Sequence, residues 1–187
     1  MNIYDFDNTI FKGDSSVKFI KYSLLKHPLK VSWALIKSLK EVFKFWFKKS
    51  NVGNIKSVMF SFVKNIDNLD EYMENFVLKY QKNIKKFYLE QKKDNDVVIS
   101  ASFLFIVQPF CKKLGIKHVI ATNYDCKKGI IIGNNCKGEE KIVRFKEHFN
   151  TDDVNEAYSD SLTDIPMFEI AKKAYLVKDE ELIIYEV

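Results

Sequence analysis

MNIYDFDNTIFKGDSS (residues 1–16) opens the chain and decides how the rest is organised. Its first six residues have the character of a short buried strand, and the Asp-Asn-Thr that follows favours a turn. Asp5 and Asp7 therefore lie at the carboxyl end of a strand, where open α/β sheets bind ligands. Two carboxylates so close together repel each other, so the site needs a proton or a cation such as Mg²⁺. Taken alone, the Asp-x-Asp pair is equally typical of a solvated turn.

The composition predicts one globular domain with an insertion. The chain has 187 residues, of which 47% are hydrophobic and 29% charged, so it can form a sizeable core. Its formal net charge is +5, but Arg144 is its only arginine. Nucleic-acid readers depend on arginine forks, so we expect no nucleic-acid partner and favour an anionic membrane or phosphate partner.

The cysteines and the N-terminus predict a cytoplasmic protein. Cys111, Cys126 and Cys136 are odd in number and lack the spacing of a metal site, which is typical of a reducing compartment. The first strand begins almost at Met1, so we expect no signal peptide.

Hydrophobic spacing divides the rest of the chain into a helical part and an alternating part. Only helices are predicted from residue 14 to about 92, and strands alternate with helices after that. The predicted helices cover 14–28, 29–50, 55–66, 69–93, 101–114, 137–149 and 161–173, and the strands 97–100, 117–123, 129–133, 154–160, 174–177 and 181–187. Such alternation implies a parallel sheet covered on both faces. We therefore expect a core of residues 1–13 and 93–187, with residues 14–92 inserted over the carboxyl edge of the sheet.

Three later stretches place polar side chains at the same edge. Ser100 ends a buried strand and is expected to enter a helix N-terminus, which favours anions. Lys141 lies in the first turn of a predicted helix, from which its ammonium can reach a phosphate. Asp160 ends a strand, and Asp164 follows at helical spacing on the same side. Each of these residues also has a simpler explanation when it is taken alone. Ser100 can be an ordinary helix cap, Lys141 one of many surface lysines, and Asp160 and Asp164 helix-capping acids.

Together, the four motifs resemble those of the haloacid dehalogenase (HAD) superfamily. The order Asp-x-Asp-x-Thr, Ser, Lys, Asp-x-x-x-Asp spans residues 1–12 and 94–178. An insertion between the first two motifs is similar to the C1-capped, phosphoserine-phosphatase-like subgroup (subfamily IB). The resemblance implies an α/β fold, with a Rossmann-like three-layer α/β/α core and an all-helical C1 cap.

The resemblance also implies a Mg²⁺-dependent phosphatase that works through an aspartyl-phosphate. Asp5 would be the nucleophile, and Asp7 the acid and base. The family's dehalogenases lack the second acid, so Asp7 favours a phosphatase. The remaining implied roles are phosphate binding by Thr9, Ser100 and Lys141, and metal binding by Asp5, Asp160 and the backbone carbonyl of Asp7, with Asp164 steadying the metal shell.

The substrate is less well specified. Phosphoserine phosphatases use an acid soon after the first motif and an arginine in the cap; here Asp14 stands near the first position, and the inserted segment has no arginine. We therefore do not expect phosphoserine, and predict a small phosphorylated metabolite. The alternatives are a phosphatidylglycerophosphate-type lipid headgroup, a phosphotransferase and, from another class, a non-catalytic binding module.

The 29–50 helix is unusual, because lysines form one narrow stripe and aromatic or aliphatic residues fill most of the rest. Its interspersed charges make it a poor transmembrane span. Burial in the cap or at a dimer contact is the simpler expectation, and the alternative is peripheral contact with the inner face of the membrane. The oligomeric state is left open.

Overall fold

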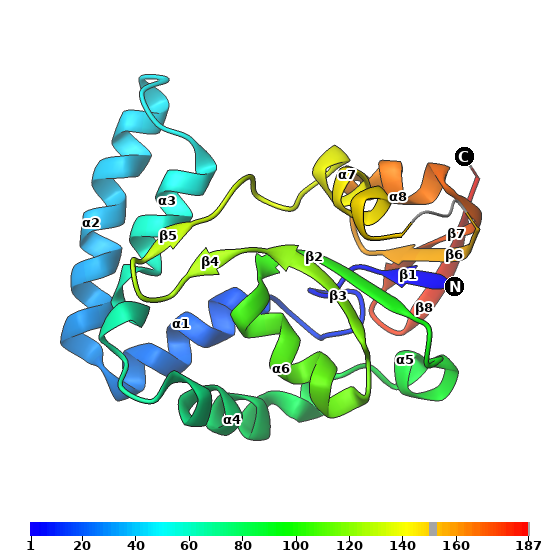
Figure 1. Ribbon diagram of the computed structural model, residues 1–187, viewed down its shortest axis with the longest axis horizontal. Coiled ribbons are helices and arrows are strands. Elements are labelled where there is room, and N and C mark those ends of the chain that lie inside the picture. Colours follow the sequence, from blue (N-terminus) through cyan, green and yellow to red (C-terminus); the bar gives the residue numbers. More distant parts are fainter. Residues whose placement is uncertain (150–152, 187) are drawn as a thin grey trace.

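The computed structural model describes residues 1–149 and 153–186, and its centre is a six-stranded sheet in the order β3-β2-β1-β6-β7-β8 (Figure 1). The first five strands in this order pair in parallel, and β8 is antiparallel at the edge. The strands are β1 (Asn2–Tyr4), β2 (Val97–Phe103), β3 (His118–Thr122), β6 (Val154–Ser159), β7 (Ala171–Lys178) and β8 (Glu181–Tyr185). The predicted α/β fold with a mainly parallel sheet is confirmed.

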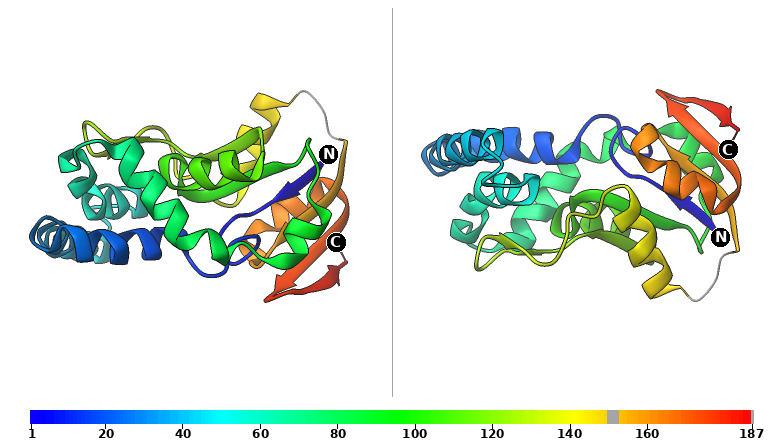
Figure 2. Two further views of the ribbon diagram at one scale, coloured as in Figure 1. Left: turned by 90° about the horizontal axis from the view of Figure 1, so that it is seen from below. Right: turned by 90° about the horizontal axis from the view of Figure 1, so that it is seen from above.

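Helices cover both faces of this sheet (Figure 2). Successive side chains of a strand point to opposite faces, so Ile3 belongs to one hydrophobic cluster and Tyr4 to the other. The Ile3 side is covered by α7 (Glu139–His148) and α8 (Ile165–Glu169), whereas α5 (Lys86–Gln91) and α6 (Leu104–Leu114) contribute to the Tyr4 side. Because both faces of β1 are buried, the residues that follow it are held in a fixed position.

The segment between β1 and β2 is helical, as the sequence predicted. Its named elements are α1 (Ser15–Lys26), α2 (Pro28–Trp46), α3 (Val52–Met59), the 3₁₀ turn η1 (Ser61–Asn65), α4 (Leu69–Tyr80), the 3₁₀ turn η2 (Gln81–Asn83) and α5. In Figure 1, α1, α2 and α3 extend away from the sheet. The division into a core and a cap at residues 14 and 92 stays a prediction.

The long helix predicted for residues 69–93 is wrong, because it is interrupted after Tyr80. The chain becomes extended at the interruption and pairs with the loop that follows β1. Lys12 N donates to Asn83 O at 2.7 Å, and Lys85 N donates to Ile10 O at 2.9 Å. Helical spacing could not reveal this tertiary pairing, which ties the end of the insertion to the first motif.

Two other helices were predicted too long or shifted. The segment 161–173 contains only the turn η3 (Leu162–Asp164) and the short helix α8, because residues from Ala171 onward pair with β6 as a strand. The helix predicted for 55–66 begins at Val52, where the Asn51 side chain accepts a hydrogen bond from Asn54 N, and gives way to η1 after Met59. In the first case tertiary strand pairing, and in the second local capping, overrides the helix boundary that hydrophobic spacing predicts.

The expectation that the aromatic helix is buried in the cap is wrong for its large side chains. Only Val31, Ala34 and Ser38 of α2 are buried. Trp33, Phe43 and Trp46 are 60%, 61% and 76% exposed. In the described part of the chain, no helix combines the length and apolarity needed to cross a membrane.

Candidate active site

The loop that follows β1 is held by backbone contacts on both sides. Asp5 N donates to Tyr158 O at 2.9 Å, which continues the pairing with β6, and Ile10 N donates back to Phe6 O at 3.1 Å. Asn8 takes a left-handed conformation with φ of 56°, which asparagine tolerates better than most residues. The side chain of Lys85, which is almost fully buried, donates to the carbonyl oxygen of Asn8. The loop is therefore fixed before any ligand arrives.

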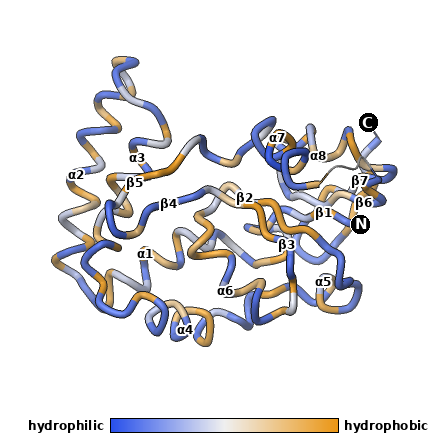
Figure 3. The backbone as a smooth tube through the Cα atoms, viewed as in Figure 1, coloured by the Kyte–Doolittle hydropathy of each residue, from blue (hydrophilic) through white to orange (hydrophobic). Residues whose placement is uncertain are grey.

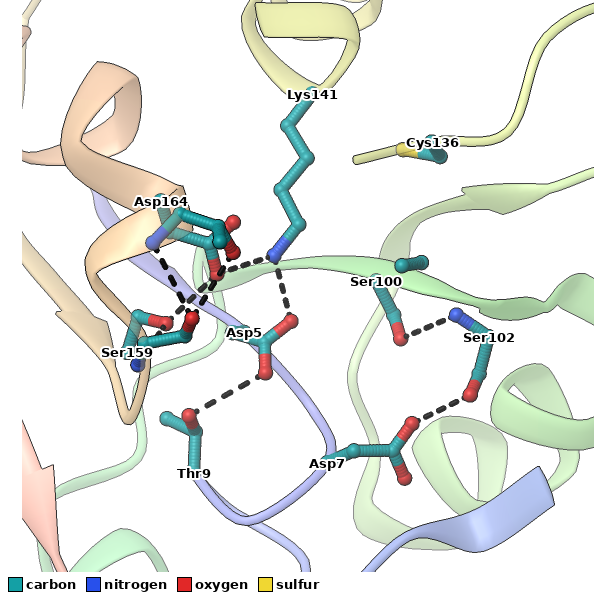
Figure 4. A network of polar contacts seen from close by, with 12 residues as sticks. Asp5, Asp7, Thr9, Ser100, Ser102, Cys136, Lys141, Ser159 and Asp164 are labelled. Atoms are coloured by element: carbon teal, nitrogen blue, oxygen red, sulfur yellow. Dashed lines mark hydrogen bonds and ion pairs between the residues drawn. The ribbon is translucent and has the colours of Figure 1, made fainter. Parts of the chain in front are cut away.

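Asp5 lies at the centre of a buried group of charges (Figure 4). Lys141 Nζ is 2.6 Å from Asp5 Oδ1 and 2.7 Å from Asp164 Oδ2. Thr9 Oγ1 is 3.3 Å from the other Asp5 oxygen, Oδ2. Ser159 Oγ donates to Asp164 Oδ2 at 2.7 Å, so Asp164 is itself positioned. Residues from three distant parts of the chain thus meet in one buried group.

Burial dominates the electrostatics of this group. It raises the pKa of Asp5 to about 7, although the charge of Lys141 acts in the opposite direction and that of Asp164 adds to the rise. For Lys141, burial alone would lower the pKa, but attraction to Asp5 and Asp164 outweighs it and raises the pKa. One ammonium between two carboxylates leaves the group with an excess of negative charge.

Asp160 lies on the other side of Thr9. Asp160 N donates to Thr9 Oγ1 at 2.9 Å, and Thr9 Oγ1 is 3.4 Å from Asp160 Oδ1. One hydroxyl therefore lies between Asp5 and Asp160 and contacts an oxygen of each carboxylate. Among the described residues, no lysine or arginine forms an ion pair with Asp160, and burial raises the pKa of its carboxyl.

Asp7 points away from Asp5, toward α1 and β2 (Figure 4). Ser15 N donates to Asp7 Oδ1 at 2.6 Å, and the Ser102 hydroxyl donates to Asp7 Oδ2. Burial raises the pKa of Asp7, and the bonds from Ser102 and Ser15 oppose that rise. A carboxyl with a raised pKa holds a proton more readily, as a general acid requires.

The expected helix N-terminus directly after Ser100 is wrong. β2 continues to Phe103 through an irregularity in its pairing with β3, and α6 begins only at Leu104. The Ser100 side chain still reaches the site, where its hydroxyl accepts a hydrogen bond from Ser102 N at 3.1 Å. Phe103 prolongs the strand because its ring is buried against Phe60 and Tyr124.

A cavity of about 330 Å³ opens onto these groups. It is lined by Asp5, Asp7, Asp14, Ser100, Lys141, Asp160 and Asp164, so it brings together all the predicted site residues except Thr9, which lies behind Asp5. Asp14 also caps α1, since its carboxylate accepts a hydrogen bond from Val17 N at 2.8 Å. A larger hollow of about 1000 Å³ beside α3 contains none of the predicted site residues.

Sequence reasoning missed seven polar side chains of the cavity, among them Lys56, Ser102 and Lys137. Lys56 comes from α3 and donates to Ala101 O at 3.1 Å and Asn135 Oδ1 at 2.9 Å. Because the chain is rich in lysine, nothing in the sequence marks these two lysines, and Ser102 stands out only because it follows Ser100 by two residues. Among the described residues, no three His, Cys, Asp or Glu side chains form a metal-binding group. The expected metal set needs only two direct carboxylates and one backbone carbonyl.

Comparison with known proteins agrees with the fold. The model of the haloacid dehalogenase-like hydrolase family matches residues 3–169. Protein CicA of Caulobacter vibrioides (strain NA1000 / CB15N) is 36% identical over 88 residues, which is 43% of this chain and 40% of CicA. The match therefore spans less than half of this relative.

Solved structures share the fold over most of the chain. A Bordetella pertussis Tohama I protein of unknown function superposes with a TM-score of 0.75 at 17% identity, covering 93% of this chain and 87% of the other. A structure described as a phospho-aspartyl intermediate analogue of phosphoserine phosphatase has a TM-score of 0.52 at 25% identity, covering 92% and 83%.

Proposed function

The chain belongs to the haloacid dehalogenase-like hydrolase family, and from that premise we propose that it hydrolyses phosphate monoesters through an aspartyl-phosphate on Asp5. The observation that carries the proposal is the Asp5 carboxylate, which is held by Lys141 at 2.6 Å and Thr9 at 3.3 Å beside a cavity. The phosphoserine phosphatase that superposes on this chain is described with a phospho-aspartyl intermediate analogue, which supports a covalent route.

In the first step, an Asp5 carboxylate oxygen attacks phosphorus, and the bond from phosphorus to the leaving oxygen breaks. Asp7 gives its proton to that oxygen, so the product leaves as an alcohol. In the second step, Asp7 takes a proton from water, which attacks the aspartyl-phosphate and releases inorganic phosphate. Asp5 and Asp7 then return to their first states. The raised pKa of Asp7 suits both of its roles.

Lys141, Thr9 and Ser100 would bind the phosphoryl oxygens. Each comes from a different element and ends in a group that can donate a hydrogen bond at the cavity or directly behind it. Preorganised donors of this kind stabilise the charge that develops on a transferring phosphoryl group. Binding phosphate would require Lys141 to divide its three donors between Asp5, Asp164 and the ligand.

The residues present fit Mg²⁺. Asp5 and Asp160 offer hard carboxylate oxygens on either side of Thr9, and the Asp7 backbone carbonyl would supply a third oxygen. No lysine or arginine in the described part of the chain forms an ion pair with Asp160, so a divalent ion would balance its charge. When bound, the ion would neutralise negative charge where the phosphate enters. Asp164 would steady the arrangement through Lys141.

Substrate selection would depend on the helical segment 14–92, which we propose acts as a cap over the carboxyl edge of the sheet. Asp14 and Lys56 from this segment line the cavity, so both signs of charge are available to a substrate. Since the segment contains no arginine, a phosphorylated metabolite other than phosphoserine is favoured. A phosphotransferase, in which an alcohol replaces water in the second step, would use the same residues.

The test is hydrolysis of p-nitrophenyl phosphate with Mg²⁺, with chelator, and by Asp5→Asn. We expect activity to disappear with chelator, to return with Mg²⁺, and to fall at least about 10⁴-fold in Asp5→Asn. Asp70→Asn, at an exposed position of α4, is the matched control and should retain full activity. Full activity of Asp5→Asn would rule out this nucleophile. An inert wild-type protein across a panel of phosphoesters would favour the binding-module alternative.

A further inference from the structure

We propose that the outer face of α2 docks, in the plane of the membrane, on a lipid bilayer with anionic headgroups. Figure 1 places α2 along the outer edge of the molecule, and Figure 3 shows hydrophobic and hydrophilic residues alternating along it. This inference does not depend on the proposed chemistry, because it rests on a surface that none of the cavity residues shares.

Several exposed apolar residues of α2 lie on the side of the helix opposite its packed residues. Leu29, Trp33, Ile36 and Phe43, with Phe47 directly after the helix, follow one another at helical spacing and are 53% to 85% exposed. The packed side carries Val31 and the small residues Ala34 and Ser38. A helix of a globular protein normally turns its largest apolar residues inward. This helix does the reverse, which leaves a long apolar strip uncovered.

The charge around this strip has one sign. Residues 15–66 contain eleven lysines and one acidic residue, Glu41. Glu41 is turned toward the molecule: its side chain is 17% exposed and accepts hydrogen bonds from Lys44 Nζ at 2.7 Å and Ser50 Oγ at 2.8 Å. The exposed lysines of α2 that flank the strip are Lys30, Lys37, Lys40, Lys44 and Lys48. The outer face therefore offers only positive charge to a partner.

An anionic bilayer fits this combination better than a second copy of the chain does. Lysines beside the strip can reach the phosphates while aromatic side chains enter the interface, where tryptophan is favoured. A second copy that docked through the same face would bring the same lysines, and residues 15–66 hold no acid besides Glu41 to pair with them. Since no described helix can cross a membrane, the helix would lie along the surface.

The two tryptophans of the chain, Trp33 and Trp46, both lie on α2 and report directly on docking. We would titrate the full chain with vesicles of phosphatidylcholine alone, and with vesicles in which part of it is replaced by phosphatidylglycerol. We expect a blue shift of tryptophan emission and co-sedimentation with the anionic vesicles only, both weakened by salt.

Three variants separate the possible occupants. Trp33→Glu should weaken vesicle binding about tenfold or more, while Leu78→Glu, which adds the same charge on the exposed face of α4, should not. Lys37→Gln with Lys40→Gln should weaken it by about fivefold for each lysine removed. Circular dichroism of each variant checks that it folds.

Several outcomes would overturn the proposal. Equal sedimentation of wild type and Trp33→Glu would do so, as would no binding to anionic vesicles. A wild-type dimer in analytical ultracentrifugation that Trp33→Glu converts to a monomer, without any vesicle binding, would assign the face to a second copy.

Discussion

The carboxyl edge of the sheet and the outer face of α2 use lysine in opposite ways. At the sheet edge, Lys141 is 1% exposed and lies between two carboxylates. On α2 the lysines are exposed, and one of them, Lys37, lies 5.3 Å from the centre of the Trp33 ring. The same residue type is a buried, paired charge in one region and a solvated flank of an apolar strip in the other.

Each region has an unfavourable arrangement of side chains: charges are buried at the sheet edge, and apolar side chains are exposed on α2. Removing a charge from water costs several kcal/mol, and good ion pairs seldom return more than that. The sheet edge keeps such charges buried, as the proposed catalysis requires. The α2 face instead leaves large apolar side chains in water, as the proposed docking on a partner requires. Substitutions should therefore have large effects at the first region and small effects at the second.

Among substitutions of charged residues, Lys141→Met should give the largest effect on stability. Removing one partner of a buried ion pair destabilises a protein by 3 to 5 kcal/mol, and we expect about 3 kcal/mol because Asp5 can take up a proton. Asp5 has a raised pKa in the folded state, so its ionisation opposes folding as pH rises. Lys141 lowers the Asp5 pKa in wild type, so its removal should raise that pKa further, and the loss relative to wild type should grow as the pH rises above about 7. Chemical denaturation at several pH values, with chelator present, measures it.

The control for this prediction is Lys37→Met on α2, whose free energy of unfolding should stay unchanged. A loss of equal size in both variants would mean that the burial of Lys141 carries no special weight. A phosphatase assay of Lys141→Met should also show little remaining activity, since no other lysine contacts Asp5 in the described part of the chain.

Asp7→Asn should come next, because it leaves the volume of the side chain unchanged and removes only the acid. Loss of a general acid–base group typically costs about 10²- to 10⁴-fold in rate. The matched exchange on α2 is Glu41→Gln, which should leave hydrolysis of a soluble substrate unchanged. Turnover numbers for p-nitrophenyl phosphate decide the matter, and a wild-type rate for Asp7→Asn would remove Asp7 from the chemistry.

Sequence reasoning located the sheet edge because Asp5 and Asp160 directly follow strands with a clear apolar pattern. Ser100 lies within β2, just before the irregularity in its pairing with β3, and parallel pairing brings all three residues to one cavity. The order of the motifs then supplied the family, although the roles of the single residues stay predictions. The helical character of the insertion also followed from spacing alone.

Features that depend on tertiary contact could not be predicted. The helix predicted for 69–93 is interrupted after Tyr80 because residues 83–85 pair with residues 10–12. No local sequence pattern predicts such pairing. Lys85 and Lys56 are ordinary lysines in sequence and become distinct only through burial. The sequence left open whether the apolar face of the 29–50 helix is buried or exposed, because apolar spacing shows which residues share a face but not whether that face is covered.

Lys85→Met should have a smaller effect than the two substitutions at the sheet edge. It removes the donor to the Asn8 carbonyl, and leaving such a group unsatisfied costs about 1 to 3 kcal/mol. Because Asn8 adjoins Asp7 in a left-handed turn, we expect kcat to fall while KM changes little. Steady-state kinetics separate the two constants. Partial recovery in Lys85→Arg, which keeps a donor, would support this positioning role, whereas a change in KM alone would contradict it.

Phenylalanine gives a contrast that involves no charge. Phe19 on α1 is 0% exposed and packs against the rings of Phe60, Phe62 and Phe76, whereas Phe43 on α2 is 61% exposed. Phe19→Ala should cost about 3 to 5 kcal/mol, because it opens a cavity in the core. Phe43→Ala should change the free energy of unfolding by no more than about 0.5 kcal/mol, as expected for a surface position. Urea denaturation of the two variants compares them directly. A large loss in Phe43→Ala would mean that the α2 face is covered in solution without any lipid, and that the contrast between the two regions does not hold.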